Sequence, residues 1–424
     1  MLLKFLQRIL AFIAGKIIKK YRPIIIGITG SVGKSSTKQT VALILKNHMN
    51  IRESKGNYNN EIGVPLTIIG VKSPGRNLVG WTKVLIFGFL KIVFKDKSYP
   101  RVLVLEMAAD RPGDIEYLLK MAPCKIGVLT AIGRAHVEFF KNIENVAHEK
   151  SAIITNLPKD GWAILNADDK RVLSLKNETS AGVLTYGLGP QADIQGLEVG
   201  LDQVLKPEGP EIRGLRFKVS YQGNIVPVFL PGTVSLSQVY VALASIAVGL
   251  PLGLNLIDLV QTLEKYKALP GRMSLIQGIN RSLIIDDTYN SSPLAVESAL
   301  ETLESIRIHP YASKWVILGD MLELGDLSRR AHYQVGKKIA RTKFDYLIAV
   351  GREARAIVQG ARENGFINEN VFSFENSLAV FKFLKPRIKT GDVILIKGSR
   401  KMKMEKLVKE IMLQPYLAKK YLVR

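Results

Sequence analysis

The sequence predicts an α/β fold in which a domain with a parallel sheet and a small antiparallel region precedes a second, doubly wound domain. Apolar strand-like runs alternate with helix-like segments around 101–106, 125–130 and 162–166, an order typical of a parallel sheet covered by helices. Residues 171–230 show short alternating runs with several glycines, which indicates the antiparallel region. After residue 273 strands and helices alternate again, which predicts the second sheet.

The chain is expected to divide into a basic amphipathic helix at 1–22, a central domain at 23–270 and a Rossmann-like C-terminal domain at 271–424. Its 424 residues and 47% hydrophobic content are ordinary for a globular protein and exclude a disordered one. The single cysteine, Cys124, excludes an internal disulfide and favours a reducing compartment, so we expect a cytoplasmic protein. The net charge of +23 favours phosphorylated substrates or anionic lipid. Nucleic acid is not expected as a partner, because no recognition motif accompanies the charge.

The first 22 residues combine an apolar stripe with basic side chains. The stripe recurs at helical spacing and consists of Leu2, Leu6, Ile9, Ile13 and Ile17. Basic residues interrupt the apolar run before it reaches spanning length, so we expect this helix to lie on an anionic membrane. These residues are Lys4, Arg8, Lys16, Lys19 and Lys20. A second apolar segment at 81–97 is equally compatible with membrane contact and with packing in a core.

The stretch "GITGSVGKSS" at 27–36 follows the apolar strand "PIIIGI" and precedes a helix-compatible segment. Backbone N–H groups at such a strand–loop–helix turn point at one spot, and the helix dipole favours an anion there. The sequence therefore predicts an ATP-binding loop, with Lys34 on the outer phosphates and the Ser35 hydroxyl on magnesium. The glycine spacing differs from that of the usual Walker A motif. The other binding residues expected in the loop are Gly30, Ser31, Gly33 and Ser36.

Two further candidates follow strand ends, where parallel sheets place ligand chemistry. Glu106 closes the run "VLVLE", and its carboxylate is a plausible magnesium ligand. His136 follows the next strand. Either residue alone is compatible with a solvent or capping position.

Seven motifs occur in the order seen in Mur ligases, and the chain resembles that family over about residues 23–410. They are "GITGSVGKSS", "GNYNNEIGVPLTI", "LEMAADRPGDIEYL", "GRAHVEFF", "DDTYNSSP", "LGDMLELG" and "KGSR". The chain is most similar to the members that add D-alanyl-D-alanine to UDP-N-acetylmuramoyl-tripeptide. The resemblance implies an ATP-dependent carboxylate–amine ligase of peptidoglycan precursor synthesis that works through an acyl phosphate.

The resemblance also implies roles for individual residues. Ser35 and Glu106 would hold one magnesium ion, and His136 with Glu106 a second. Lys150 matches the family lysine that reacts with carbon dioxide to form a carbamate, although a surface lysine is the alternative. The residues implied at the nucleotide are Asn59 and Asn60 near the phosphates, Arg272 from the hinge, and Asp287, Tyr289 and Asn290 from the C-terminal domain.

The sequence departs from the family pattern in two places. The basic helix stands where Mur ligases have an N-terminal UDP-binding domain, so the acceptor is expected to be a muramyl peptide that is either UDP-linked or lipid-linked. Ser237 and Gln238 replace a His-Asn pair near the adenine site, which leaves recognition of the base open. The alternatives are a folylpolyglutamate-synthase-like ligase, against which "GNYNNEIGVP" and "LGDMLELG" argue, and a non-catalytic ATP-binding scaffold of cell-wall assembly.

Overall fold

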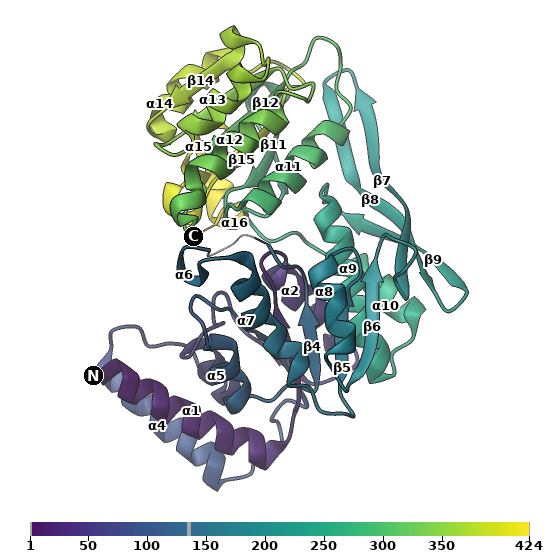
Figure 1. Cartoon of the computed structure of the whole chain (residues 1–424), viewed down its shortest axis with the longest axis vertical. Coiled ribbons are helices and arrows are strands. Elements are labelled where there is room, and N and C mark those ends of the chain that lie inside the picture. Colours follow the sequence, from purple (N-terminus) through teal and green to yellow (C-terminus); the bar gives the residue numbers. More distant parts are fainter. Residues whose placement is uncertain (1, 134–136, 424) are drawn as a thin grey trace.

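The structure is a computed structural model that describes residues 2–133 and 137–423. Two sheets, each covered by helices on both faces, lie one beyond the other along the long axis of the molecule (Figure 1). The fold class predicted from the sequence is therefore confirmed. The first sheet contains nine strands within the described residues, and the second contains six.

The first sheet is parallel from β2 to β7 and antiparallel from β7 to β9. In spatial order its strands are β2 (Ile51–Glu53), β3 (Val102–Glu106), β1 (Ile24–Thr29), β4 (Ile126–Leu129), β5 (Trp162–Asn166), β6 (Gly182–Gly187), β7 (Ile194–Lys206), β8 (Gly209–Tyr221) and β9 (Asn224–Pro231). Strand β6 lies inside the region predicted to be antiparallel, yet it extends the parallel part. It begins and ends with a glycine, and its first three residues are half-buried. Its sequence therefore does not show the continuous apolar run that marks the central strands.

The second sheet is parallel except for its edge strand β10. In spatial order its strands are β10 (Ser274–Gln277), β11 (Leu283–Asp287), β15 (Val393–Lys397), β12 (Lys314–Gly319), β13 (Tyr346–Val350) and β14 (Val371–Phe374). The helices of the chain are α1 (Leu2–Tyr21), α2 (Lys34–Lys46), α3 (Gly63–Ile69), α4 (Leu78–Val93), α5 (Asp114–Met121), α6 (Val137–Phe140), α7 (Ile143–Thr155), α8 (Lys170–Ser174), α9 (Leu236–Gly249), α10 (Leu256–Leu263), α11 (Pro293–Ser305), α12 (Ser328–Ile339), α13 (Arg355–Glu363), α14 (Ser377–Leu384), α15 (Glu405–Ile411) and α16 (Ala418–Tyr421).

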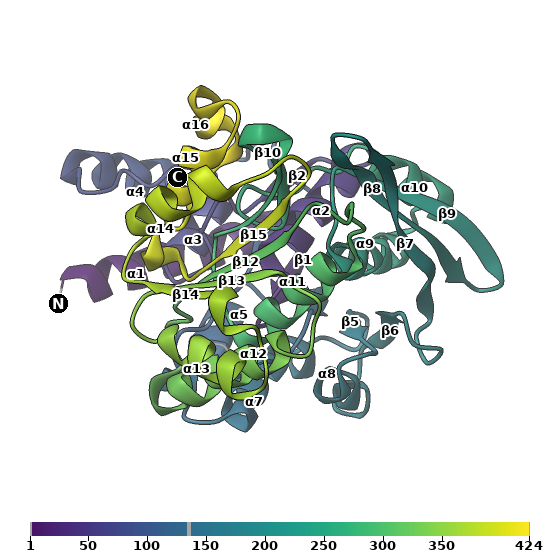
Figure 2. The same cartoon turned by 90° about the horizontal axis from the view of Figure 1, so that it is seen from above.

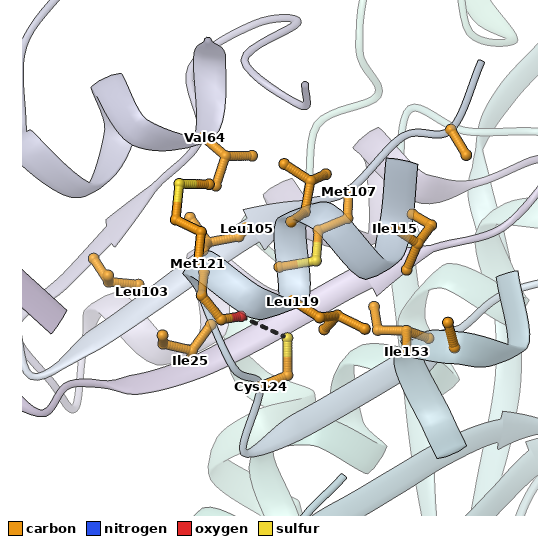
Figure 3. Close-up of a cluster of buried hydrophobic side chains, with 14 of the residues drawn as sticks. Ile25, Val64, Leu103, Leu105, Met107, Ile115, Leu119, Met121, Cys124 and Ile153 are labelled. Carbon is orange, nitrogen blue, oxygen red and sulfur yellow. Dashed lines mark hydrogen bonds between the residues drawn. The ribbon is translucent and has the colours of Figure 1, made fainter. Parts of the chain in front are cut away.

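Alternate side chains of the first sheet enter two separate cores, as the period of two along a strand requires. Leu103 and Leu105 of β3 face α3, α5 and α7, whereas Val102 and Val104 face α2, α9 and α10. Figure 3 shows the first of these cores, in which the Cys124 thiol donates to the Ala122 carbonyl at 3.7 Å. Burial raises the pKa of Cys124 to about 12, so this thiol is an inert core residue.

Helix α1 packs against α3 and α4, and the part of its apolar stripe from Leu6 to Ile17 is buried or half-buried in this packing, while the side chain of Leu2 lies outside the described part of the chain. Ile17 is fully buried, Ile13 nearly so, and Leu6 and Ile9 are half-buried. The expectation that this stripe faces a membrane is therefore wrong. The same helical periodicity suits a protein core, and α4 supplies the missing partner from a distant part of the sequence. Among the described residues no helix is both long and apolar enough to span a bilayer.

Candidate active site

The loop between β1 and α2 has the backbone geometry that its glycines predict. Gly30 and Gly33 have φ angles of 144° and 84°, which favour glycine. A Cβ atom at Gly30 would lie 2.0 Å from the Thr130 hydroxyl, so the neighbouring strand end leaves no room for a side chain. The same hydroxyl donates to the Val32 carbonyl at 2.6 Å, and Ser31 N–H donates to the Ala131 carbonyl at 2.8 Å. The end of β4 thus holds the loop in place.

Lys34 begins α2, and its ammonium donates to the Gly30 carbonyl at 2.6 Å. Burial lowers its pKa, and Arg272 lowers it further while Glu106 acts in the opposite direction. Ser36 is buried one position after Ser35. The loop therefore presents a lysine and two hydroxyl residues at the positively polarised end of a helix.

Glu106, at the end of β3, is the centre of a polar cluster. Its Oε1 accepts hydrogen bonds from the Ser35 hydroxyl and the Asn59 amide, each at 3.0 Å. Its Oε2 lies 3.5 Å from the Lys38 ammonium. Burial raises the pKa of Glu106, but Lys38, Lys34 and the two hydrogen bonds outweigh it, and the net pKa is lowered. Glu106 is therefore a carboxylate under ordinary conditions.

The cluster fits a divalent cation at Ser35 and Glu106. Oε2 of Glu106 is buried and accepts no hydrogen bond from any described residue, so it has lone pairs available. Carboxylate and hydroxyl oxygens are the ligands that Mg²⁺ prefers, together with phosphate oxygens. The described residues contain no group of three His, Cys, Asp or Glu side chains that would form a metal site alone. His136 lies outside the described residues.

The C-terminal unit reaches the phosphate loop through Arg272 and Tyr289. The Arg272 guanidinium donates to the Ser35 hydroxyl at 3.1 Å and lies 4.0 Å from the centroid of the Tyr289 ring. The Tyr289 hydroxyl donates to the Asn57 side chain at 2.6 Å. These contacts join residues more than 230 positions apart in the sequence, so both units contribute to one site.

A buried ion pair between Lys397 and Asp287 lies at the same end of the second sheet as Tyr289. Lys397 Nζ lies 2.6 Å from Asp287 Oδ2 and donates to the Asn290 carbonyl at 2.8 Å. The pair joins the end of β15 to the end of β11 and to the segment after it. Asp287 and Asn290 are thereby held at the same edge of the second sheet as Tyr289.

A cavity of about 950 Å³ lies between the two units. It brings together most of the residues expected at the nucleotide, namely Ser31, Gly33, Lys34, Ser35, Ser36, Asn59, Glu106, Arg272, Asp287, Tyr289 and Asn290. Asn60 instead accepts from the N–H groups of Ile62 and Gly63 at the start of α3 and lines a separate small cavity beside Glu61. A volume of this size suits a nucleotide together with a second substrate.

Lys150 is buried in α7, and no hydrogen bond from its ammonium to any described residue is found. Burial lowers its pKa to about 7 from an ordinary 10.5, and Lys34 contributes in the same direction. The adjacent Glu149 accepts from the N–H groups of Gly113 and Ile115, at 2.7 Å each. A substantial fraction of the Lys150 amine is therefore neutral near pH 7.

The cavity is also lined by residues that sequence reasoning missed, among them Asp168 and Tyr240. Asp168 accepts from the Leu188 and Gly189 N–H groups and from the Tyr240 hydroxyl. The signal was available, because "NADD" at 166–169 begins at the last residue of strand β5, at the same sheet edge as Glu106. Lys38 was also missed, since a lysine within a helix usually lies on the surface.

Ser237 and Gln238 line the same cavity at the start of α9. The Ser237 hydroxyl lies 2.8 Å from the Ser235 hydroxyl. The Tyr266 hydroxyl donates to the side-chain oxygen of the buried Gln238. Only part of the Gln238 amide is therefore available to a base.

Two family models match the chain. One, described as the Mur ligase middle domain, covers residues 28–78 and 88–249, and the other, described as the Mur ligase glutamate ligase domain, covers 271–400. The chain belongs to the Mur ligase family. Mur ligases are ATP-dependent enzymes that form amide bonds, so the chain has the fold and the loop of an ATP-dependent ligase.

Two relatives of this Mur ligase carry the same enzyme name. UDP-N-acetylmuramoyl-tripeptide–D-alanyl-D-alanine ligase of Bacillus subtilis is 30% identical over 391 residues, which are 92% of this chain and 76% of that protein. The Escherichia coli ligase of the same name is 27% identical, over 91% of this chain and 76% of its own.

Two solved structures of ligases named MurF are also similar to this chain. MurF from Acinetobacter baumannii superposes with a TM-score of 0.77 at 25% identity, covering 94% of this chain and 79% of its own. The MurF ligase of Thermotoga maritima in complex with ADP superposes with a TM-score of 0.75 at 27% identity, covering 98% of this chain and 84% of its own.

Proposed function

We propose that this Mur ligase joins D-alanyl-D-alanine to the terminal carboxylate of a muramyl tripeptide, as the names of its relatives describe for them. The observation that supports this most directly is a cluster of polar residues at one cavity, which consists of Lys34, Ser35, Glu106 and Arg272. The cavity is large enough for a nucleoside triphosphate and a substrate carboxylate to bind next to each other. The fold division at 23–270 and 271–424 would then separate ATP binding from part of amine binding.

The proposed reaction has two steps. The substrate carboxylate attacks the γ-phosphorus of ATP, the bond to the β–γ bridging oxygen breaks, and ADP leaves. The amine then attacks the acyl phosphate carbon, phosphate leaves, the amine loses a proton and an amide forms. Lys34 and Arg272 would stabilise charge on the moving phosphoryl group. Closure between Asn57 and Tyr289 would keep water from the acyl phosphate.

Magnesium would be held by Ser35 and Glu106, with the contribution of His136 left as a prediction. When bound, it neutralises phosphate charge. ATP is the cofactor that the family uses. We propose the cytoplasm as the location, since a single cysteine and a need for ATP both suit that compartment.

The Lys150 carbamate is a further part of the proposal. Its neutral amine nitrogen would attack the carbon of carbon dioxide, a C–N bond would form as one C=O π bond breaks onto oxygen, and the nitrogen would release one proton, which turns the neutral amine into an anionic carbamate. The depressed pKa and the absence of a hydrogen-bond partner among the described residues support this chemistry. The nearby positive charge of Lys34 would stabilise the product.

The test is a product analysis with the full chain. ATP, magnesium and D-alanyl-D-alanine are supplied with a UDP-linked or a lipid-linked muramyl tripeptide, and products are identified by mass spectrometry. We expect a muramyl pentapeptide, ADP and phosphate in equal amounts with at least one acceptor. ATP hydrolysis that no acceptor stimulates, or an absence of ATP turnover, would contradict the proposal, and the second result would favour a non-catalytic scaffold.

A further inference from the structure

Helix α4 has an apolar face that no other described part of the chain covers. Six of its side chains, or those directly after it, have more than half of their surface exposed: Leu78, Val79, Ile86, Phe89, Val93 and Phe94. Phe87 and Leu90 are exposed as well. We call these eight residues the α4 face. Monomeric soluble proteins rarely present so continuous an apolar surface unless it binds something.

Packing fixes the direction of this face. A Cβ atom on Gly88 would lie 2.7 Å from Ile13 of α1 and 3.5 Å from Ile69 of α3. This side of α4 therefore packs closely against α1 and α3. Val84 is buried on the same side. Residues 79, 86, 90 and 93 recur at helical spacing on the other side. Helix α4 contacts α1, and Figure 1 shows the two helices side by side, projecting from the body of the molecule; in Figure 2 both project from the same side of it.

Helix α1 holds α4 in this orientation and adds to the exposed apolar surface. The Tyr21 hydroxyl donates to the Lys91 carbonyl at 3.0 Å, and Lys20 donates to the Ile92 carbonyl at 2.8 Å, so α1 supplies donors to the C-terminal carbonyls of α4. Phe5 and Phe12 of α1 are also exposed.

Helices α1 and α4 and the residues next to them carry mainly positive charge. The sequence has no Asp or Glu in 1–22 or in 70–95. The exposed basic residues of these two segments are Lys4, Arg8, Lys16, Lys19, Lys20, Arg22, Lys72, Arg76, Lys83 and Lys95. The first acidic residue after α4, Asp96, is paired with Lys91 at 2.7 Å. An apolar face with a basic border is the pattern of an interfacial helix, in which lysine heads reach the lipid phosphates while apolar side chains enter the acyl boundary.

We propose that the α4 face, supported by α1, docks this protein on an anionic lipid surface. A second copy of the chain is a poor occupant, because pairing two such faces would bring the basic borders together. With 16 residues α4 is too short to cross a bilayer and would lie along it. The match to the Mur ligase middle domain omits residues 79–87, which include three of the eight residues of the α4 face, Val79, Ile86 and Phe87.

Docking through this face would also place the catalytic unit relative to the lipid. Gln7 of α1 donates to Glu61 at 2.9 Å, directly after the loop that holds Asn59 and Asn60. This hydrogen bond connects α1 to the segment that holds Asn59 and Asn60, and α1 also packs against α3, which follows that segment. The inference does not depend on the proposed reaction, since lipid binding is measured without substrates.

The test is co-sedimentation of the full chain with vesicles of phosphatidylcholine alone or mixed equally with phosphatidylglycerol. We expect binding to the anionic vesicles that is at least about tenfold tighter and weakens at high salt. The variant Ile86→Ser/Phe89→Ser/Val93→Ser should lose at least about tenfold in binding, because it removes inserted apolar area without disturbing buried residues.

The matched control is Ile225→Ser/Ile257→Ser/Ile367→Ser, which changes three comparably exposed isoleucines elsewhere. It should bind as the unchanged chain does. The inference is overturned if the unchanged chain ignores anionic vesicles, if the control loses as much binding as the α4 variant, or if sedimentation velocity shows an oligomer that the α4 variant dissociates. The last result would assign the face to a second copy.

Discussion

Glu106 illustrates how neighbouring residues decide the state of a single side chain. A carboxyl group in so buried a position would normally hold its proton. Here one oxygen receives two hydrogen bonds, and the other faces the Lys38 ammonium. Lys38 therefore keeps the carboxylate charged. It lies in α2, the helix that directly follows the phosphate loop.

Lys34→Ala and Glu106→Ala are each expected to lower kcat for ATP turnover by a factor on the order of 10² to 10³, because each removes a fixed charge from the phosphate region. ADP release measures the effect, and circular dichroism checks folding. Asp160→Ala, which changes an exposed carboxylate, should leave turnover unchanged. Near-normal turnover in a folded Lys34 or Glu106 variant would show that the site is assigned incorrectly.

Lys150 is expected to form its carbamate more readily as the pH rises through about 7. The folded protein depresses the amine pKa from 10.5 to about 7, so the neutral, reactive form is present above pH 7 and is lost below it. NMR with ¹³C-labelled bicarbonate should detect a carbamate signal that Lys150→Ala removes. The exposed Lys159 provides a control as Lys159→Ala.

Activity supplies a second measurement for Lys150. Lys150→Ala should lose turnover and regain part of it when a short carboxylic acid is added, since the added anion replaces the carbamate. Full activity of Lys150→Ala without the additive would show that the carbamate has no role.

At the scale of one element, helix α1 contributes to the core of the first unit. Leu10, Ala14 and Ile17 are fully buried against α3, α4 and the helices nearby. The basic residues of α1 lie on its exposed side. The helix therefore has a structural role in addition to the proposed support of the α4 face.

Ile17→Ala is expected to lower the free energy of unfolding by about 2–5 kcal/mol, because it leaves a cavity in a fully buried position. Chemical denaturation monitored by circular dichroism measures the change. The exposed neighbour Lys16→Ala should change it by less than about 0.5 kcal/mol. Equal effects of the two substitutions would mean that the apolar stripe of α1 is not part of the core.

At the scale of the whole molecule, the β7–β8 ribbon links the two units beside the cavity. Gln203 of β7 hydrogen-bonds through its side-chain amide with the backbone of Arg307, and its carbonyl accepts from the Arg307 guanidinium at 3.4 Å. Near the ribbon tip, the Tyr311 hydroxyl donates to the Pro207 carbonyl at 2.6 Å. The ribbon thereby limits how far the second unit can move from the phosphate loop (Figure 1).

Gln203→Ala removes the side-chain half of this contact, so we expect the two units to separate more widely. Small-angle scattering should give a larger radius of gyration, and kcat should fall by about tenfold because closure over the intermediate is less populated. The exposed Gln261→Ala in α10 should change neither quantity. An unchanged radius of gyration in Gln203→Ala would exclude the ribbon as a restraint on the two units.

The sequence by itself determined the fold class, the glycine-rich loop between β1 and α2, and a set of polar residues that line the cavity between the two units. These features are local: apolar runs of strand length, glycines at a strand–helix turn, and polar residues at strand ends, which a parallel sheet gathers at one edge. The three strands expected around residues 101–166 are β3, β4 and β5 of the structure.

Only the tertiary structure decided which apolar faces are buried. The stripe of α1 and the apolar face of α4 have the same periodicity in the sequence, yet one is enclosed and the other exposed, because α4 and α3 meet α1 from distant positions. The hydrogen-bond partners of Glu106 and Arg272 and the burial of Lys150 were undetermined for the same reason. Periodicity shows that a helix has an apolar side, whereas the element that covers this side is set by long-range packing.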